Sequence, residues 1–491
     1  MAPKNILVLI ADDLGREQMS CYGGPTSLTP NLDGLAASGT RFTNAFASTA
    51  SCSGSRTTIY TGLHTHQTGS YGLVGEMNGF QTLPQIVTAP KLFNDLGYKT
   101  GIINKVHVGP PDVYPWSVRT IEERGGESRD GAMIAARASQ FLSDAKAEAK
   151  PFFLTIGYTD PHRALGTRGG FGNVEGNHSP LLHDRVFKPD EVQVPPFLSD
   201  LPEVRQELAE YYRAIHRLDQ SIGLVLSALE KSGLGQDTLV LFLSDNGPPF
   251  INSKTTLYDA GIHLPFLLRI PGATPGAVNP NLISYVDVLP TLLAYAGHDD
   301  LNTGAAAGPR RGRSILPILS SRAEEEGWTE VYGSHTFHEV TNYWPTRYLR
   351  TGRWKYHRNV CWKLDFPFAM DLYASLSFEG IRNSTPPVIG QRSLKSYIQR
   401  PAEELYDLEA DPLEVNNLAA DPAHKEVLVG LRARLENWQE ETRDLWLWRD
   451  GTAVRRYRNW EGYGREGLTI PDRFDFDVES PGTKGVGIYE L

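Results

Sequence analysis

The stretch Asn5-Ile6-Leu7-Val8-Leu9-Ile10-Ala11, followed at once by Asp12-Asp13, decides the fold of this chain. Three further short apolar runs, residues 100–103, 152–157 and 239–243, also lead into side chains that can bind a metal ion or carry a proton. Continuous apolar runs are typical of parallel strands buried on both faces, and open α/β sheets bind ligands beyond the carboxyl ends of such strands. The sequence therefore predicts an α/β fold built on a mostly parallel sheet, with one site supplied by four strands.

The segments between these runs carry helical patterns. The clearest covers residues 207–232 and ends at Gly233, with apolar side chains at steps of three and four residues: Leu208, Tyr211, Tyr212, Ile215, Leu218 and Ile222. This spacing predicts an amphipathic helix that packs against the sheet. No membrane or partner-binding role is needed to explain it.

The pattern changes in the last third of the chain. Short strand-like segments occur at residues 348–357 and 404–408, and a helical pattern occurs at residues 423–442. A chain of 491 residues also exceeds the size at which one hydrophobic core stops growing. We therefore expect a large α/β domain over residues 1–325 and a smaller α+β domain over residues 326–491 that completes the substrate pocket.

The composition limits the partners of the chain. With 40% hydrophobic and 22% charged residues, a net charge of -10 and a pI near 5.8, it lacks the basic character of nucleic-acid-binding proteins. The three cysteines, Cys21, Cys52 and Cys361, are too scattered for a disulfide framework. The apolar run before Asp12 is too short and wrongly flanked for a signal peptide or a membrane span. We expect an intracellular, cytoplasmic protein with neither nucleic acid nor membrane as partner.

Two strand ends offer hard oxygen ligands. Asp12 and Asp13 follow the first run, and Asp245 and Asn246 follow the run at residues 239–243. Calcium and magnesium prefer such carboxylate and amide oxygens. An Asp-Asp pair after a strand is also common as a turn or a helix cap. Because two such pairs converge on one edge of the predicted sheet, we favour a metal site.

The other two strand ends carry groups that can move protons. Lys105 and His107 are two residues apart, so both would project from one face if the strand continued through them. Asp160, His162 and Arg163 follow the run at residues 152–157 around a proline that limits further strand pairing. A structural histidine and an ordinary turn capped by aspartate are the alternatives.

The segment Cys52-Ser53-Gly54-Ser55-Arg56, followed by Thr61-Gly62, resembles the signature of type I sulfatases. In that family a Cys-x-Pro-x-Arg core directs oxidation of the cysteine to formylglycine, and here Gly54 replaces the proline. The resemblance implies an alkaline-phosphatase-like fold and a formylglycine-generating enzyme as a partner. It also implies that a calcium or magnesium ion is held by Asp12, Asp13, Asp245, Asn246 and the modified Cys52.

The resemblance also implies a role for each of the other candidate residues. The hydrated aldehyde at residue 52 would attack the sulfur, and His162 would protonate the leaving group. His107 would then take a proton from the second hydroxyl, which expels sulfate. The remaining residues would supply fixed positive charge or contact the substrate: Arg56, Lys105 and Lys254 for the charge, Asp160 and Arg163 for the contact.

Several separated segments narrow the resemblance to the heparan N-sulfatase, or sulfamidase, branch of the family. They are residues 104–109, 113–115, 160–163, 244–247, 257–258 and 338–341. The resemblance places His338 and Glu339 in the sugar pocket, although such polar loop residues are as often merely exposed. The family resemblance also suggests a homodimer. The expected substrate is a small sulfated molecule or a sulfated sugar. Within that class we expect hydrolysis of a sulfate ester on a sulfated sugar or of the sulfamate of an N-sulfated sugar.

Two alternatives remain open at this point. One is another activity of the same superfamily, namely an arylsulfatase, an alkylsulfatase or a hydrolase of phosphonates or phosphate esters, because the metal and cation set suits any tetrahedral anion. The other is a catalytically impaired anion-binding homologue, which is expected if Cys52 stays a thiol. The leaving-group pocket distinguishes the first alternative, and the chemical state of Cys52 distinguishes the second.

Overall fold

The structure of the protein is a computed structural model. It describes residues 4–447 except 26–27, 76, 121–127, 165–167, 175–178 and 303–308. Beyond residue 447 it describes only the backbone of four short strands, β16 (Asn459–Trp460), β17 (Arg465–Thr469), β18 (Phe476–Asp477) and β19 (Ser480–Lys484). The smaller domain is predicted over residues 326–491, and apart from these four strands its part beyond residue 447 lies outside the described residues. The domain boundary near residue 325 stays a prediction.

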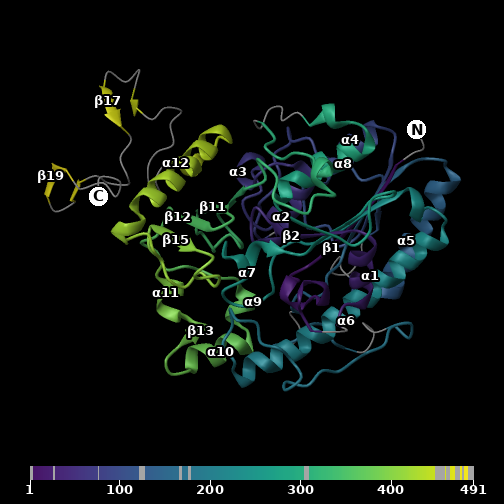
Figure 1. Cartoon of the computed structure of the whole chain (residues 1–491), viewed down its shortest axis with the longest axis horizontal. Helices are drawn as coiled ribbons and strands as arrows, with labels where there is room; N and C mark the ends of the chain where they lie inside the picture. The colour runs from purple at the N-terminus through teal and green to yellow at the C-terminus, as the bar shows by residue number, and fades with distance from the viewer. Residues whose placement is uncertain are drawn as a thin grey trace.

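A nine-stranded sheet forms the centre of the molecule (Figure 1). The four predicted runs are β1 (Asn5–Ala11), β3 (Lys99–Asn104), β5 (Phe152–Gly157) and β6 (Thr238–Ser244), and they are parallel neighbours in the order β3-β5-β1-β6. The other strands are β2 (Thr40–Phe46), β4 (Val118–Thr120), β7 (His263–Leu264), β8 (Phe266–Arg269) and β9 (Ala277–Ser284). The mostly parallel sheet is confirmed, and the carboxyl ends of its four central strands meet at one edge.

Helices cover both faces of this sheet (Figure 1). Leu7 and Leu9 of β1 point into a core shared with α1 (Pro30–Ser38), α5 (Gly131–Ala147) and α6 (Pro202–Lys231). The alternate residues of β1 point into a second core with α2 (Cys52–Thr61), α4 (Ala89–Asp95) and α8 (Val288–Ala296). This period-two alternation buries β1 on both sides.

Helix α6 begins earlier than its apolar pattern indicates. The predicted helix starts at residue 207, whereas α6 starts at Pro202. Proline is well tolerated at the first helical position, because its missing N–H would have no partner there. In the described residues no helix combines the length and the apolar character needed to cross a bilayer.

The C-terminal region contains a smaller antiparallel sheet in the order β10 (Glu330–His335), β11 (Thr346–Thr351), β12 (Trp354–Asn359) and β15 (Glu403–Asp407). Helix α12 (Lys425–Glu441) packs on it and forms a third small core. The predicted strands and helix of this region are thus confirmed. The remaining short α-helices and strands among the described residues are α3 (Thr65–Thr68), α7 (Asp259–Ile262), α9 (Met370–Tyr373), α10 (Leu376–Asn383), α11 (Leu394–Ile398), β13 (Val388–Ile389) and β14 (Arg392–Ser393).

Candidate active site

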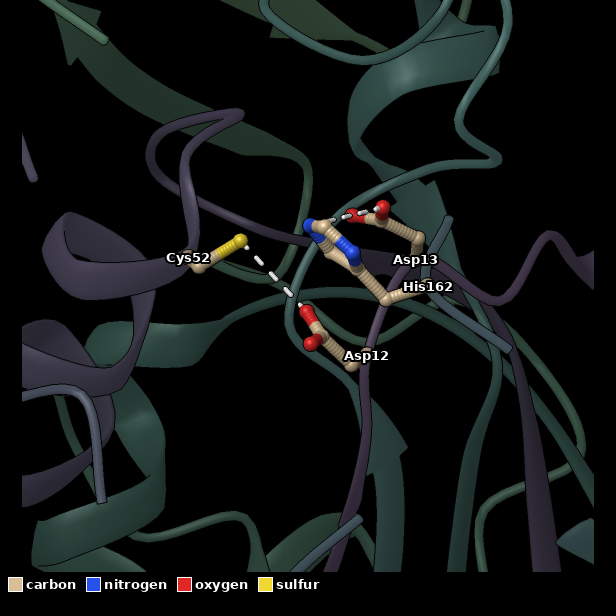
Figure 2. A group of neighbouring side chains, drawn as sticks. All are labelled: Asp12, Asp13, Cys52 and His162. Atoms are coloured by element: carbon tan, nitrogen blue, oxygen red, sulfur yellow. Dashed lines mark hydrogen bonds and ion pairs between the residues drawn. The ribbon is translucent and has the colours of Figure 1, made fainter. Parts of the chain in front are cut away.

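Cys52 is the first residue of helix α2 and points toward the end of β1 (Figure 2). Its sulfur lies 3.4 Å from Asp12 Oδ1 and 3.4 Å from Asn246 Oδ1. Burial, followed by the charges of Asp12 and Asp245, raises the pKa of the Cys52 thiol well above its usual value. An unmodified Cys52 therefore stays protonated at neutral pH and is a poor nucleophile in this site.

Gly54 lies in the first turn of α2, where the family signature has proline. A Cβ atom at this position would lie 3.0 Å from the Thr49 Cγ2 methyl and 3.0 Å from the Thr65 Cγ2 methyl. Both distances are below the usual carbon–carbon separation of about 3.5 to 4.0 Å. A side chain at residue 54 would therefore require these two methyl groups to shift by a few tenths of an ångström.

The two predicted oxygen-ligand pairs meet at the carboxyl ends of β1 and β6. The backbone N–H of Asp13 donates to Asp245 Oδ1 at 3.2 Å, and Asn246 Nδ2 donates to Asp13 Oδ1 at 2.6 Å. Burial and the nearby charge of Asp12 raise the pKa of Asp245 to about 8. Crowded buried carboxylates of this kind favour a bound cation.

A set of metal-ligand atoms is present in this cluster. Asp12, Asp13, Cys52 and His162 each place one such atom within 4.8 Å of the others (Figure 2). Together with Asn246, the cluster offers mainly carboxylate and amide oxygens, which fits calcium or magnesium. The residues present are therefore suited to hold a divalent cation.

Three buried cations surround the carboxylates. Arg56 Nε donates to Asp245 Oδ2 at 2.8 Å, Lys105 Nζ lies 2.5 Å from Asp12 Oδ2, and Lys254 Nζ lies 2.9 Å from Asp13 Oδ2. The Arg56 Nη2 atom is buried and has no hydrogen-bond partner among the described residues. A donor with no protein partner in such a site is available to an anionic ligand.

Strand β3 ends at Asn104, so the condition under which Lys105 and His107 would project from one face of a continuing strand is not met. Asn104 and His107 have φ angles of 69° and 50°, so the backbone turns instead of continuing as a strand. The turn still brings Lys105 to Asp12. Burial and the charge of Lys105 lower the pKa of His107 well below its usual value, which keeps its imidazole neutral.

His162 lies on the turn after β5 and faces the same cluster. Its Nδ1–H donates to the Arg163 carbonyl at 2.7 Å, and its Nε2 lies 3.0 Å from Lys254 Nζ and 3.7 Å from Asp13 Oδ2. Since the ammonium can only donate, Nε2 is the acceptor in this state. The backbone contact therefore fixes the ring with Nε2 directed into the site.

Asp160 and Arg163 are bound to groups within the protein. Asp160 accepts hydrogen bonds from Arg217 at 2.7 Å and from Arg129 at 2.5 Å. Arg163 forms a two-point pair with Glu207 at 2.8 and 2.6 Å. These contacts hold the turn that carries His162, and the substrate contact expected of both residues stays a prediction. The sequence analysis did not identify Glu207 and Arg217 as partners of this turn. Both are charged residues on the buried face of α6, and such residues indicate buried ion pairs.

The C-terminal region closes one side of the site. His338 Nδ1 lies 3.0 Å from the hydroxyl of Ser51, the residue before Cys52. Glu339 Oε1 accepts the Met370 N–H at 3.4 Å, and Asp371 of α9 lies 3.1 Å from Lys254 Nζ. Asp371 was not predicted, because no motif surrounds it and only the folded chain brings it to Lys254.

Comparison with known proteins identifies the family. Residues 4–298 match the sequence model of the sulfatase family. Human N-sulphoglucosamine sulphohydrolase is 36% identical over 467 residues, which cover 91% of this chain and 91% of that protein. The chain belongs to the sulfatase family. The family resemblance of the Cys52 segment is thereby confirmed, and so is the sulfatase activity class.

Solved structures agree on the fold. A protein in complex with its substrate D-glucosamine-2-N,6-O-disulfate superposes with a TM-score of 0.64 at 20% identity, covering 90% of this chain and 98% of that one. The phosphonate monoester hydrolase of Agrobacterium radiobacter gives a TM-score of 0.65 at 20% identity, covering 92% and 98%. The alkaline-phosphatase-like arrangement expected for this sulfatase is therefore confirmed.

Proposed function

We propose that this sulfatase hydrolyses the sulfamate of an N-sulfated sugar, with O-sulfated sugars as weaker substrates. The observation that carries the proposal is the 36% identity to human N-sulphoglucosamine sulphohydrolase across 91% of both chains. The site geometry supports it, since Cys52 lies at a helix N-terminus beside three buried cations. A helix N-terminus and fixed cations both favour an anionic sulfo group.

Two groups would complete this site. A calcium or magnesium ion held by Asp12, Asp13, Asp245 and Asn246 would offset the charge of the sulfuryl oxygens. A formylglycine at residue 52, made by a formylglycine-generating enzyme, would supply the attacking oxygen. The modification would replace a thiol that stays protonated and is a poor nucleophile at this position. A homodimer remains an expectation from the family resemblance alone.

The cations would hold the substrate while the histidines move protons. Arg56, Lys105 and Lys254 would bind the sulfo oxygens. His162 would protonate the leaving nitrogen or oxygen from Nε2 once that atom carries a proton, since in the free protein Nε2 accepts a hydrogen bond from Lys254 at 3.0 Å. General acid catalysis of this kind typically contributes about 10² to 10⁴ in rate. His107, held neutral, would accept the proton whose removal releases sulfate.

The experiment is a comparison of sulfate release from N-sulfoglucosamine, glucosamine 6-sulfate and 4-nitrophenyl sulfate, with phenylphosphonate as a fourth substrate. Protein produced with a formylglycine-generating enzyme and supplied with calcium is expected to give the highest kcat/KM on N-sulfoglucosamine. A higher kcat/KM on the aryl sulfate or on the phosphonate would assign the protein to the alternative activity. Absence of turnover with every substrate, in protein modified at residue 52, would overturn the proposal.

A further inference from the structure

Lys254 has as many acceptors around its ammonium group as it has hydrogens to donate. Its Nζ lies 2.9 Å from Asp13 Oδ2, 3.0 Å from His162 Nε2 and 3.1 Å from Asp371 Oδ2, and its side chain is 1% exposed. A lysine has three N–H donors. A sulfo group that accepts a hydrogen bond from Lys254 must therefore displace one of these three partners.

Asp371 is the partner that such a sulfo group can replace with the least disturbance. Asp13 is also bound by Asn246 Nδ2, and His162 is held through its Nδ1 by the backbone. In the described part of the chain, the Asp371 side chain has Lys254 as its only hydrogen-bond partner. Once Lys254 turns to the sulfo oxygens, Asp371 is left as an anion next to the leaving-group side of the site.

A second carboxylate lies beside Asp371. Glu339 is partly exposed, and its Oε1 accepts the N–H of Met370, the residue before Asp371. Burial and the charge of Asp371 both raise the pKa of Glu339. Two adjacent carboxylates repel the anionic sulfo group of a substrate and therefore weaken its binding. This repulsion is offset if the sugar part of the substrate offers the carboxylates a cation or hydrogen-bond donors.

The chemistry of sulfamate hydrolysis supplies that cation. For a sulfamate, R–NH–SO3⁻ and H2O give R–NH3⁺ and SO4²⁻: the S–N bond breaks, nitrogen keeps the electron pair, and it gains two protons. For a sulfate ester, R–O–SO3⁻ and H2O give the neutral alcohol R–OH, with SO4²⁻ and one H⁺. Only the first reaction places a positive charge on the leaving group, next to His162.

We propose that Asp371 is a specificity-determining residue that binds the amino group of the leaving sugar and so favours N-sulfo over O-sulfo substrates. This inference rests on the proposed function. The ammonium formed on the sugar takes the place that the Lys254 ammonium has in the free protein. Glu339 borders the same position and accepts hydrogen bonds from the sugar.

The substitution Asp371→Asn tests the proposal, because it keeps the size of the side chain and removes its charge. Hydrogen bonds to charged groups are roughly twice as strong as neutral ones, so kcat/KM for N-sulfoglucosamine is expected to fall by about 10- to 100-fold. The value for 4-nitrophenyl sulfate is expected to change by less than about threefold, because its leaving group carries no amine for residue 371 to bind. Equal losses on both substrates would instead show that Asp371 only positions Lys254, and would overturn the proposal.

A binding measurement separates this proposal from the proposed function. Glucosamine and glucose are titrated calorimetrically into protein saturated with inorganic sulfate, which occupies the sulfo site. Glucosamine is expected to bind at least about tenfold more tightly than glucose to the unsubstituted protein, and this preference is expected to disappear in Asp371→Asn. Equal affinities in the unsubstituted protein would overturn the proposal even if N-sulfoglucosamine is hydrolysed. A retained preference with no hydrolysis would overturn the proposed function alone.

Asp365→Asn is the matched control, since this carboxylate belongs to the same region of the chain and is exposed. It is expected to leave both kcat/KM values and the glucosamine preference unchanged. The melting temperatures of both variants are compared with that of the unsubstituted protein. If Asp371→Asn lowers the melting temperature, Asp371→Glu is measured as a second variant. It retains the charge and is expected to restore the preference for glucosamine.

Discussion

The buried ion pair between Arg163 and Glu207 allows a quantitative test of what stabilises the turn after β5 that carries His162. Glu207 is fully buried on α6, and its carboxylate accepts hydrogen bonds from Arg163 at 2.8 and 2.6 Å and from the backbone N–H of Leu376 at 2.8 Å. Glu207→Ala would leave the Arg163 charge buried without its partner. Removing one member of a buried ion pair costs about 3 to 5 kcal/mol, so we expect a loss of this size in the free energy of unfolding.

The substitution is also expected to lower activity, since Arg163 adjoins His162 and its Nε donates to the Pro249 carbonyl at 2.8 Å, in the loop that leads to Lys254. The assay is urea denaturation, together with kcat/KM for N-sulfoglucosamine. Glu230→Gln is the control on the same helix. Its carboxylate contacts Arg269 at 3.1 Å and is 48% exposed, so a loss below about 1 kcal/mol is expected. A loss below about 1 kcal/mol for Glu207→Ala as well would refute the reasoning about the buried pair.

Three further predictions concern the metal, the acid and the pH dependence. Asp12→Asn is expected to weaken calcium binding, measured by calorimetry, and to lower activity in parallel, because a neutral amide replaces a carboxylate ligand. His162→Ala is expected to lower kcat/KM on sugar substrates about 10² to 10⁴-fold but far less on 4-nitrophenyl sulfate, whose leaving group needs little protonation. Burial alone would raise the pKa of Glu404, but the charges of His357 and Arg400 lower it to about 2. Its contribution to the free energy of unfolding is therefore present above about pH 4.5 and is lost as the pH falls through about 2.

Each of these predictions has a contrary outcome. Full activity of Asp12→Asn in metal-free protein, with the exposed Asp95→Asn as control, would exclude the metal role. Equal losses on both substrates would count against His162 as the acid. For Glu404, an acid-unfolding curve that is the same in Glu404→Gln as in the unsubstituted protein would show that this carboxyl does not contribute.

The parts of the fold that depend on apolar patterning could be predicted from the sequence. The runs at β1, β3, β5 and β6 are continuous because both faces of these strands are buried, and this property is visible residue by residue. Their common edge then follows from parallel pairing. The convergence of Asp12, Asp13, Asp245 and Asn246 was predictable for the same reason.

The parts that depend on backbone turns and on distant contacts could not be predicted in this way. The end of β3 depends on left-handed conformations at Asn104 and His107, which the apolar pattern does not encode. Asp371 reaches Lys254 only through the packing of the C-terminal region. By contrast, Glu207 and Arg217 could have been recognised, because charged residues on the apolar face of a long helix need buried partners.

The space around Gly54 bears on the departure from the family signature. Because Thr49 and Thr65 fill the volume next to Gly54, a proline at this position would not fit without movement of both methyl groups. The glycine is thus matched to its surroundings in the folded protein.

The chemical state of Cys52 tests the central claim most directly. The measurement is mass spectrometry of the peptide that contains Cys52, from protein made with and without a formylglycine-generating enzyme, alongside sulfate release from N-sulfoglucosamine. The account predicts a loss of about 18 Da from the cysteine peptide, as expected when an aldehyde replaces the thiol, and sulfate release in proportion to the modified fraction. An unchanged cysteine under both conditions, or sulfate release that does not depend on the modified fraction, would contradict it.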